Sequence, residues 1–159
     1  AYIDALAQSV ERAYAAKEVK PDVLVASYHG MPIRYLMEGD PYHCQCAKTT
    51  RLLRERLGWD KTAIDTTFQS VFGREEWLKP YTVNHVAELA RQGKKRIAVI
   101  APAFSADCIE TLEEINGEIR ESFEHAGGEE FTYIPCLNDD AAHIDALVQV
   151  IEANLAGWV

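Results

Sequence analysis

The sequence has 159 residues, of which 48% are hydrophobic, and this suffices for one domain of ordinary size around its own core. A formal net charge of −9 argues against nucleic acid as a partner, because binding to phosphates requires clustered Lys and Arg side chains. The sequence shows no apolar run of the roughly 18 residues that span a membrane and no signal-peptide pattern, so we expect a cytoplasmic protein with reduced cysteines.

Four apolar, strand-like segments alternate with helical patterns along the chain. An Ala-rich, periodic helix is predicted first, within residues 1–18. Strands are then predicted at residues 23–28, 64–71, 96–101 and 131–134, and helices at 42–57, 80–92, 107–125 and about 140–155. Strands separated by helices of this length predict one α/β domain over residues 1–159, with a four-stranded parallel sheet and helices on both of its faces.

The chemically distinctive side chains follow the predicted strands, at the edge where open parallel sheets bind ligands. They are His29 after the first strand, Gln69 and Trp77 after the second, Phe104 and Glu110 after the third, and Cys136 and Asn138 after the fourth. We therefore expect a binding site at this edge, with Asn138 as a turn or cap residue.

His29 is a candidate proton acceptor. Histidine is the side chain whose ordinary pKa lies closest to neutrality, so it can take up protons at working pH. The same position, directly before Gly30, also suits a histidine that only hydrogen-bonds the loop.

Glu110 has two interpretations. The pattern Asp107-x-x-Glu110 resembles a capping box, in which the glutamate bonds back to the first residue of the pattern. Glu110, Glu114 and Glu118 are also spaced by four residues, which places them on one ridge of a helix. The ridge suits either a solvated face or a row of oxygen ligands along which a divalent cation moves. An apolar stripe is predicted on another face of this helix, formed by Ile109, Leu112, Ile115, Ile119 and Phe123.

The cysteines and aromatic residues are less specific signals. Cys44-x-Cys46 is too closely spaced for the common zinc half-site, so buried thiols are favoured over a zinc site or an iron–sulfur cluster. Cys108 is the candidate soft metal contact. Five aromatic residues near the predicted edge can belong to the core or wall a flat, apolar ligand: Phe68, Phe72, Trp77, Tyr81 and Phe104.

Five segments, in this order, resemble the ferrochelatases, which insert ferrous iron into a porphyrin. They are residues 27–32 (SYHGMP), 39–42 (GDPY), 68–82 (FQSVFGREEWLKPYT), 102–114 (PAFSADCIETLEE) and 135–138 (PCLN). The likeness runs from about residue 20 to 155. It implies a Rossmann-like (chelatase-like) fold and a two-domain enzyme of which this chain is the C-terminal half, so that the N-terminal domain is a missing partner.

The resemblance also implies an activity. It implies a lyase that inserts Fe²⁺ into protoporphyrin IX to form protoheme, the last step of heme biosynthesis, and that can associate peripherally with the inner membrane. Fe²⁺ is the substrate metal, and no iron–sulfur cluster is expected, because the cysteine-rich extension of some members is lacking. This chain would supply one half of the active site and be inactive alone.

Site residues follow from the same resemblance. His29 is implied as proton acceptor, metal ligand or both, and Glu110 as a second metal ligand or proton shuttle, the two facing each other across the cleft. Glu114 and Glu118 match the acidic ridge that guides iron or removes protons. Contacts with the porphyrin are expected from Trp77, Phe104 and Gln69.

Two departures from the family pattern bear on these expectations. Cys108 stands where many members have His, and Val71 stands where a basic residue is common. The alternatives are a chelatase for another metal or tetrapyrrole, and a half-domain that only binds metal or porphyrin.

Overall fold

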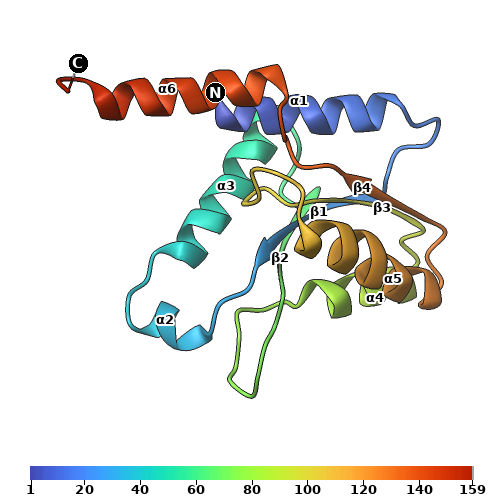
Figure 1. Cartoon of the computed structure of the whole chain (residues 1–159). Helices are drawn as coiled ribbons and strands as arrows, with labels where there is room; N and C mark the ends of the chain where they lie inside the picture. The colour runs from blue at the N-terminus through green and yellow to red at the C-terminus, as the bar shows by residue number, and fades with distance from the viewer. Residues whose placement is uncertain (159) are drawn as a thin grey trace.

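A four-stranded, all-parallel sheet forms the centre of the computed structural model, which describes residues 1–158 (Figure 1). Its strands are β1 (Val23–His29), β2 (Ile64–Gln69), β3 (Arg96–Ile100) and β4 (Glu130–Ile134), in the spatial order β2-β1-β3-β4. The helices are α1 (Tyr2–Ala15), α2 (Ile33–Met37), α3 (Tyr42–Leu57), α4 (Thr82–Arg91), α5 (Arg120–His125) and α6 (Ala141–Leu155), with the π-helix η1 (Glu110–Ile119) leading directly into α5. The predicted α/β fold with a parallel sheet is confirmed.

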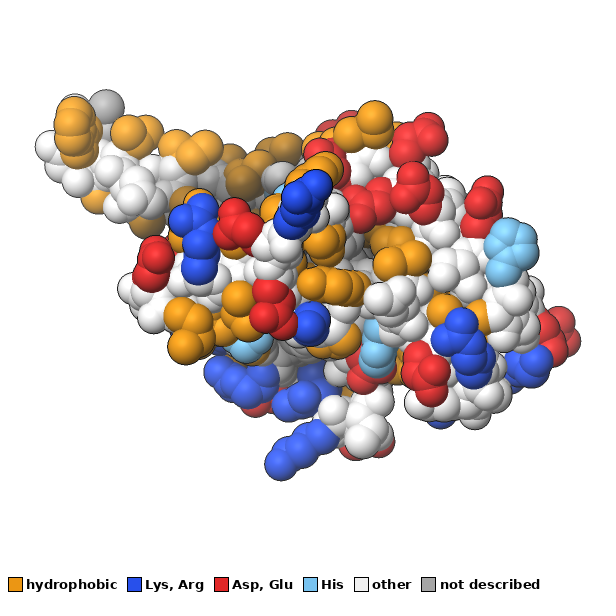
Figure 2. Space-filling model, turned by 90° about the horizontal axis from the view of Figure 1, so that it is seen from below, with side chains coloured by type: hydrophobic (Ala, Val, Ile, Leu, Met, Phe, Trp, Pro, Cys, Tyr) orange, Lys and Arg blue, Asp and Glu red, His pale blue; other side chains and the backbone are white. Residues whose placement is uncertain are grey.

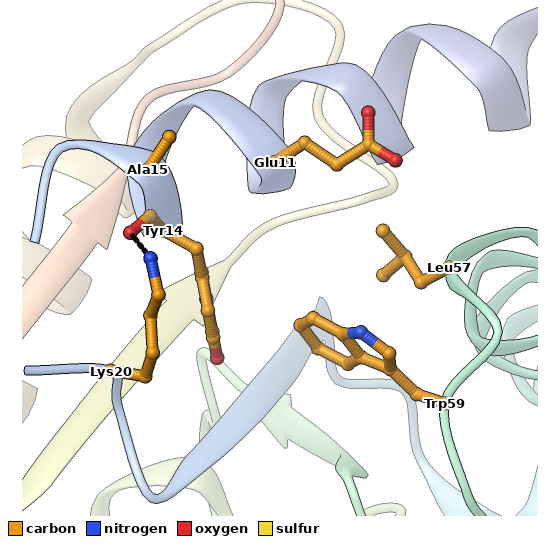
Figure 3. A pocket seen from close by; sticks show the side chains of 6 residues that line it. All are labelled: Glu11, Tyr14, Ala15, Lys20, Leu57 and Trp59. Carbon is orange, nitrogen blue, oxygen red and sulfur yellow. Dashed lines mark hydrogen bonds between the residues drawn. The ribbon is translucent and has the colours of Figure 1, made fainter.

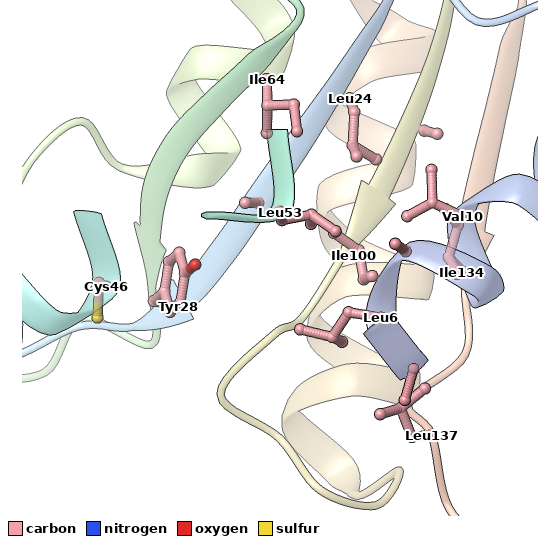
Figure 4. Packing of buried hydrophobic residues seen from close by; sticks show 14 of the residues in the cluster. Leu6, Val10, Leu24, Tyr28, Cys46, Leu53, Ile64, Ile100, Ile134 and Leu137 are labelled. Atoms are coloured by element: carbon pink, nitrogen blue, oxygen red, sulfur yellow. The ribbon is translucent and has the colours of Figure 1, made fainter. Parts of the chain in front are cut away.

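The sheet is covered on both faces because side chains alternate along each strand. In β1, Leu24, Ala26 and Tyr28 face a core shared with α1 and α3. Figure 4 shows side chains of this core, from Leu6 and Val10 of α1 to Ile134 of β4. The intervening Val23 and Val25 face a second core, which they share with α4, η1 and α5.

The end of β2 and the start of α4 each differ by two residues from the prediction. β2 ends at Gln69 rather than at residue 71, because Ser70 has a φ of 62°, in the left-handed region that ends an extended strand. α4 begins at Thr82 rather than at Pro80, because the Pro80 carbonyl is paired with the Phe68 N–H beside β2. The short helix α2 lies between the strand predicted at 23–28 and the helix predicted at 42–57, in a segment for which no element was predicted.

The long helix predicted over residues 107–125 begins at Glu110 and is a π-helix for its first ten residues. A π-helix bonds residues five apart and therefore has more residues in each turn than an α-helix. Side chains three residues apart therefore point in different directions, so Leu112 does not share a face of the helix with Ile115. The predicted apolar stripe is correct for Ile115, Ile119 and Phe123, which are buried, and wrong for Ile109 and Leu112, which are 69% and 51% exposed.

α6 carries its last turns away from the rest of the molecule (Figure 1). Only its first half packs on the domain, where His143 and Ala146 are the buried side chains of this helix. The projecting arm carries hydrophobic side chains on its surface (Figure 2). No helix within residues 1–158 combines the length and the apolar character needed to cross a bilayer.

Candidate functional site

His29 is the last residue of β1, at the carboxyl edge of the sheet. Its backbone carbonyl accepts a hydrogen bond of 2.9 Å from the Tyr42 hydroxyl. Its Nδ1 lies 2.7 Å from the Gly30 carbonyl oxygen, and since a carbonyl only accepts, Nδ1 must carry the hydrogen. Nε2 is then the nitrogen with the lone pair. The bond to the loop and a proton-accepting role, which the sequence left as alternatives, are therefore compatible.

Aromatic rings surround the His29 imidazole. The rings of Phe72 and Phe104 each lie 6.4 Å from it between centroids, and Trp77 packs edge-on against Phe72 at 5.9 Å. Phe72 is 64% exposed, whereas Phe68 is buried in the core at 1% exposure. The predicted aromatic set therefore divides into core members and a surface group beside His29.

Trp77 is tied to the loop that follows His29. Gly30 packs so closely on it that a Cβ at this position would lie 3.1 Å from the indole ring and 2.7 Å from the Gln69 carbonyl oxygen. The half-buried Trp77 also keeps its Nε1 shielded from solvent, without a hydrogen-bond partner in the described part of the chain.

Glu110 opens η1 and is accessible to solvent. A hydrogen bond from the Cys108 thiol lowers the pKa of its carboxyl group, and the positive charge of protonated His29 lowers this pKa further. The two predicted catalytic residues, one at the end of β1 and one at the start of η1, thus lie at the same edge of the sheet.

The predicted capping box is not formed. The Asp107 N–H donates to Asn138 Oδ1 at 2.8 Å, so it is not available to Glu110. The Asp107 carboxylate accepts from Asn138 Nδ2, the Tyr133 hydroxyl and the Thr111 hydroxyl instead. Burial acts to raise the pKa of Asp107, but these hydrogen bonds outweigh it and the pKa lies below its ordinary value. Asn138, with a φ of 48°, is a turn residue that joins the loops after β3 and β4.

Glu110, Glu114 and Glu118 are not equivalent, although they share a ridge. Glu118 is exposed, whereas Glu114 accepts three hydrogen bonds from the end of β2, two of them from Ser70. An open cavity of about 370 Å³ runs along this ridge beside the loop after β2. Its lining consists of Ser70, Val71, Phe72, Ile109, Glu110, Glu113, Glu114 and Glu118.

The cysteines are thiols. Burial raises the pKa of Cys46 to about 11 and that of Cys136 to about 12, and it also raises the pKa of Cys108. Binding of a metal to any of these three would have to displace the thiol proton. Within residues 1–158, no three His, Cys, Asp or Glu side chains are grouped closely enough to hold a metal ion.

A larger cavity of about 460 Å³ lies at the other edge of the sheet, between the ends of α1 and α3. Figure 3 shows the rings of Tyr14 and Trp59 on its wall, and their centroids are 5.1 Å apart. Because this cavity contains none of the predicted site residues, we place the candidate site at the carboxyl edge.

A series of buried, hydrogen-bonded polar side chains behind the site was not predicted from the sequence. The Ser27 hydroxyl bonds to Gln69 Oε1 at 2.7 Å and lies 2.8 Å from the Thr82 hydroxyl, which bonds in turn to Thr67. All four side chains are at most 2% exposed. Small polar residues inside otherwise apolar strands could have indicated this series, because buried hydroxyl groups need hydrogen-bond partners.

Comparisons with known proteins relate the chain to one enzyme family. The family model for ferrochelatases matches residues 1–155. Ferrochelatases from Rhodobacter capsulatus, Allorhizobium ampelinum and Marinobacter nauticus are 77%, 58% and 57% identical to it, and each aligns with 99% of the chain. These alignments cover 45%, 46% and 42% of the relatives, so the chain spans about half the length of the curated relatives it matches.

A solved structure supports the fold. The crystal structure of a putative cobalamin biosynthesis CbiX protein from Marinobacter aquaeolei aligns with a TM-score of 0.56, covering 84% of this chain and 96% of that one. At 13% sequence identity, this likeness concerns the fold alone.

Proposed function

The chain belongs to the ferrochelatase family, and from this premise we propose that it forms one wall of a site in which Fe²⁺ is inserted into protoporphyrin IX to give protoheme. The five segments from which the resemblance was predicted all lie within the family match. Because the chain spans about half the length of its relatives, the activity, with Fe²⁺ and the porphyrin as its substrates, belongs to the longer enzyme. The remaining part of that enzyme is the proposed partner, and it supplies the opposite wall.

Metal insertion requires proton acceptors. A porphyrin loses two pyrrole N–H protons when Fe²⁺ takes their place, and a planar macrocycle must be distorted before its nitrogen lone pairs reach the metal. Nε2 of His29 carries a lone pair that can accept one of these protons or bind the iron. The Glu110 carboxylate is accessible to solvent, so it can pass protons outward or act as a second metal ligand.

The observation that carries the proposal is the pairing of these two groups at one sheet edge. The charge of a protonated His29 is one of the causes that lower the pKa of Glu110, after the hydrogen bond from the Cys108 thiol. The acidic cavity beside them would offer hard oxygen ligands to an incoming divalent cation. Trp77 and Phe104, with the exposed Phe72, provide an aromatic surface against which a porphyrin can pack.

The test is iron insertion by a full-length ferrochelatase that carries this chain in place of its matching segment. We expect His29→Ala to abolish turnover, and Glu110→Gln to reduce it strongly. His125→Ala, at the exposed end of α5, is the matched control and should retain activity. Near-normal turnover by His29→Ala would contradict the assignment.

Two further measurements distinguish the alternatives. Assays of the active enzyme with Co²⁺ and Zn²⁺, and with other tetrapyrroles, test whether Fe²⁺ and protoporphyrin IX are the preferred substrates. The 159-residue chain alone should form no metalloporphyrin, because one face of the macrocycle stays in water. Binding of porphyrin or metal by this chain without turnover is the expected result.

A further inference from the structure

Gln69 is the last residue of β2, and both ends of its side-chain amide are bonded within the protein. Oε1 accepts from the Ser27 hydroxyl at 2.7 Å. Nε2 donates to the Glu110 carbonyl oxygen at 2.8 Å and to Glu114 Oε2 at 3.1 Å. Since a carbonyl and a carboxylate only accept, the amide can take only this orientation. The side chain is 2% exposed and committed to the protein, which speaks against the predicted contact with a porphyrin.

The backbone of Gln69 contacts the other half of the candidate site. Gln69 pairs with His29 in the register of β1 and β2. Its carbonyl oxygen accepts a hydrogen bond of 2.6 Å from the N–H of Gly30, the residue that follows His29. One residue therefore bonds to the strand end that carries His29 and to the helix turn that carries Glu110.

Glu114 completes the connection between β2 and η1. Ser70 donates its N–H to Glu114 Oε1 at 2.6 Å and its hydroxyl to Oε2 at 2.5 Å. With the bond from Gln69, three donors hold this carboxylate in place. Charge-assisted hydrogen bonds of this kind are about twice as strong as neutral ones.

We propose that Gln69 is a positioning residue that sets where Glu110 stands relative to His29, with Glu114 as the anchor of the helix. The proposal rests on the function proposed above for His29 and Glu110. The Glu110 carbonyl oxygen and the Glu114 carboxylate are both bonded to the end of β2, so these bonds would determine the direction in which Glu110 projects from the first turn of η1. Glu114 then acts as a fixed attachment point, in contrast to the exposed Glu118 on the same ridge.

Gln69→Glu is the sharpest test, because it preserves the size and the acceptor for Ser27 but turns a second acceptor toward Glu114 and the Glu110 carbonyl. In the 159-residue chain, we expect amide hydrogen exchange in η1 to become faster by about tenfold or more, the size expected for losing a hydrogen bond to a charged group. Gln92→Glu is the matched control, because Gln92 Nε2 also donates to a glutamate, Glu88, but on the exposed surface of the molecule. It should leave exchange in η1 unchanged.

The second measurement is made in the full-length enzyme that carries this chain. For Gln69→Glu we expect kcat to fall by about tenfold or more while the KM for porphyrin stays within about twofold, because positioning acts on the reacting groups and not on porphyrin binding. A raised KM with an unchanged kcat would overturn the proposal and indicate direct contact with the porphyrin. Unchanged exchange in η1 would overturn it as well.

Failure of the proposed function can be told apart from failure of this inference. If the unsubstituted full-length enzyme inserts no iron, the proposed function fails, and hydrogen exchange in η1 alone decides whether Gln69 anchors the helix. If Gln69→Glu prevents folding, Ser70→Ala removes one donor to Glu114 and should speed exchange in η1 by a smaller factor. Exchange at the unsubstituted rate in Ser70→Ala would then count against the anchor.

Discussion

Asp107 and Asn138 bond to each other twice across the carboxyl edge of the sheet. The Asp107 N–H donates to Asn138 Oδ1 at 2.8 Å, and Asn138 Nδ2 donates to Asp107 Oδ2 at 2.8 Å. The pair joins the loop after β3 to the loop after β4, and it fixes the segment from which η1 begins. The structure of the site therefore depends on residues that do not line it.

The stability of this pair should depend on pH. Hydrogen bonds hold the pKa of Asp107 below its ordinary value of 3.8, so the folded protein binds its proton less readily than the unfolded chain does. The resulting stabilisation is complete above the ordinary pKa and is lost as pH falls through the lower, folded value. We expect Asn138→Gly to lower the free energy of unfolding by about 1–2 kcal/mol at pH 7 and to weaken the loss of stability below about pH 4.

Urea denaturation of the chain between pH 2 and 7 measures this effect. Glycine is the appropriate substitute because residue 138 has a positive φ, which alanine would adopt only with strain. Asn84→Ala, on the exposed face of α4, serves as the control. An acid dependence in Asn138→Gly identical to that of the unsubstituted chain would rule out this role for the pair.

Gly30→Ala should disturb the site through packing. The new Cβ would meet the Gln69 carbonyl oxygen at 2.7 Å and the Trp77 ring at 3.1 Å, so residue 30 must move away from the end of β2 and from the indole. Overpacking of this kind costs about 1–3 kcal/mol of stability. Fluorescence of Trp77, recorded with Trp59 and Trp158 replaced by Phe, should report the displacement of the ring.

Gly117→Ala is the matched control for this substitution. Gly117 lies in η1, and a Cβ there would meet no neighbouring atom within 4 Å. We expect unchanged Trp77 emission and a stability equal to or above that of the unsubstituted chain, since alanine favours helices more than glycine does. Equal emission spectra for Gly30→Ala and Gly117→Ala would contradict the close approach at Gly30.

Cys108→Ala should raise the pKa of Glu110. The thiol hydrogen bond is the largest contribution that lowers this pKa, and the substitution removes it while leaving His29 in place. Carboxyl-detected NMR titration of the chain can follow Glu110 directly. Cys44→Ala, at an exposed position on α3, should leave the Glu110 titration unchanged. A Glu110 titration in Cys108→Ala that matches the unsubstituted chain would mean that the thiol does not bond to the carboxylate.

The sequence predicted the parallel sheet well, because its strands depend on local patterns. Val23 and Leu24 alternate between two cores, and such alternation is visible without knowledge of the tertiary structure. The same reasoning placed His29 and Glu110 at one edge, since all strands run parallel and their ends meet there.

The sequence did not predict the features that depend on local backbone conformation, such as the π-helix. The π-helix retains a four-residue spacing of buried residues at Thr111, Ile115 and Ile119, which an α-helix would also accommodate. Ser70, whose N–H donates to Glu114, has a left-handed backbone, which no pattern of polar and apolar residues indicates. The burial of the Gln69 side chain was likewise not visible in the sequence, and its contact with a porphyrin stays a prediction.

α6 presents an exposed apolar stripe along most of its length. Its members are Ile144, Leu147, Val148, Ile151 and Leu155, each 40–54% exposed and spaced by three or four residues. Contiguous apolar surface of this kind favours association. We expect the 159-residue chain to self-associate through this stripe. The pair of substitutions Leu147→Lys and Ile151→Lys should render it monomeric in sedimentation velocity experiments.

Val150→Lys is the control, because Val150 is 61% exposed on the same helix but lies off the stripe. If all three proteins sediment alike, α6 does not mediate association.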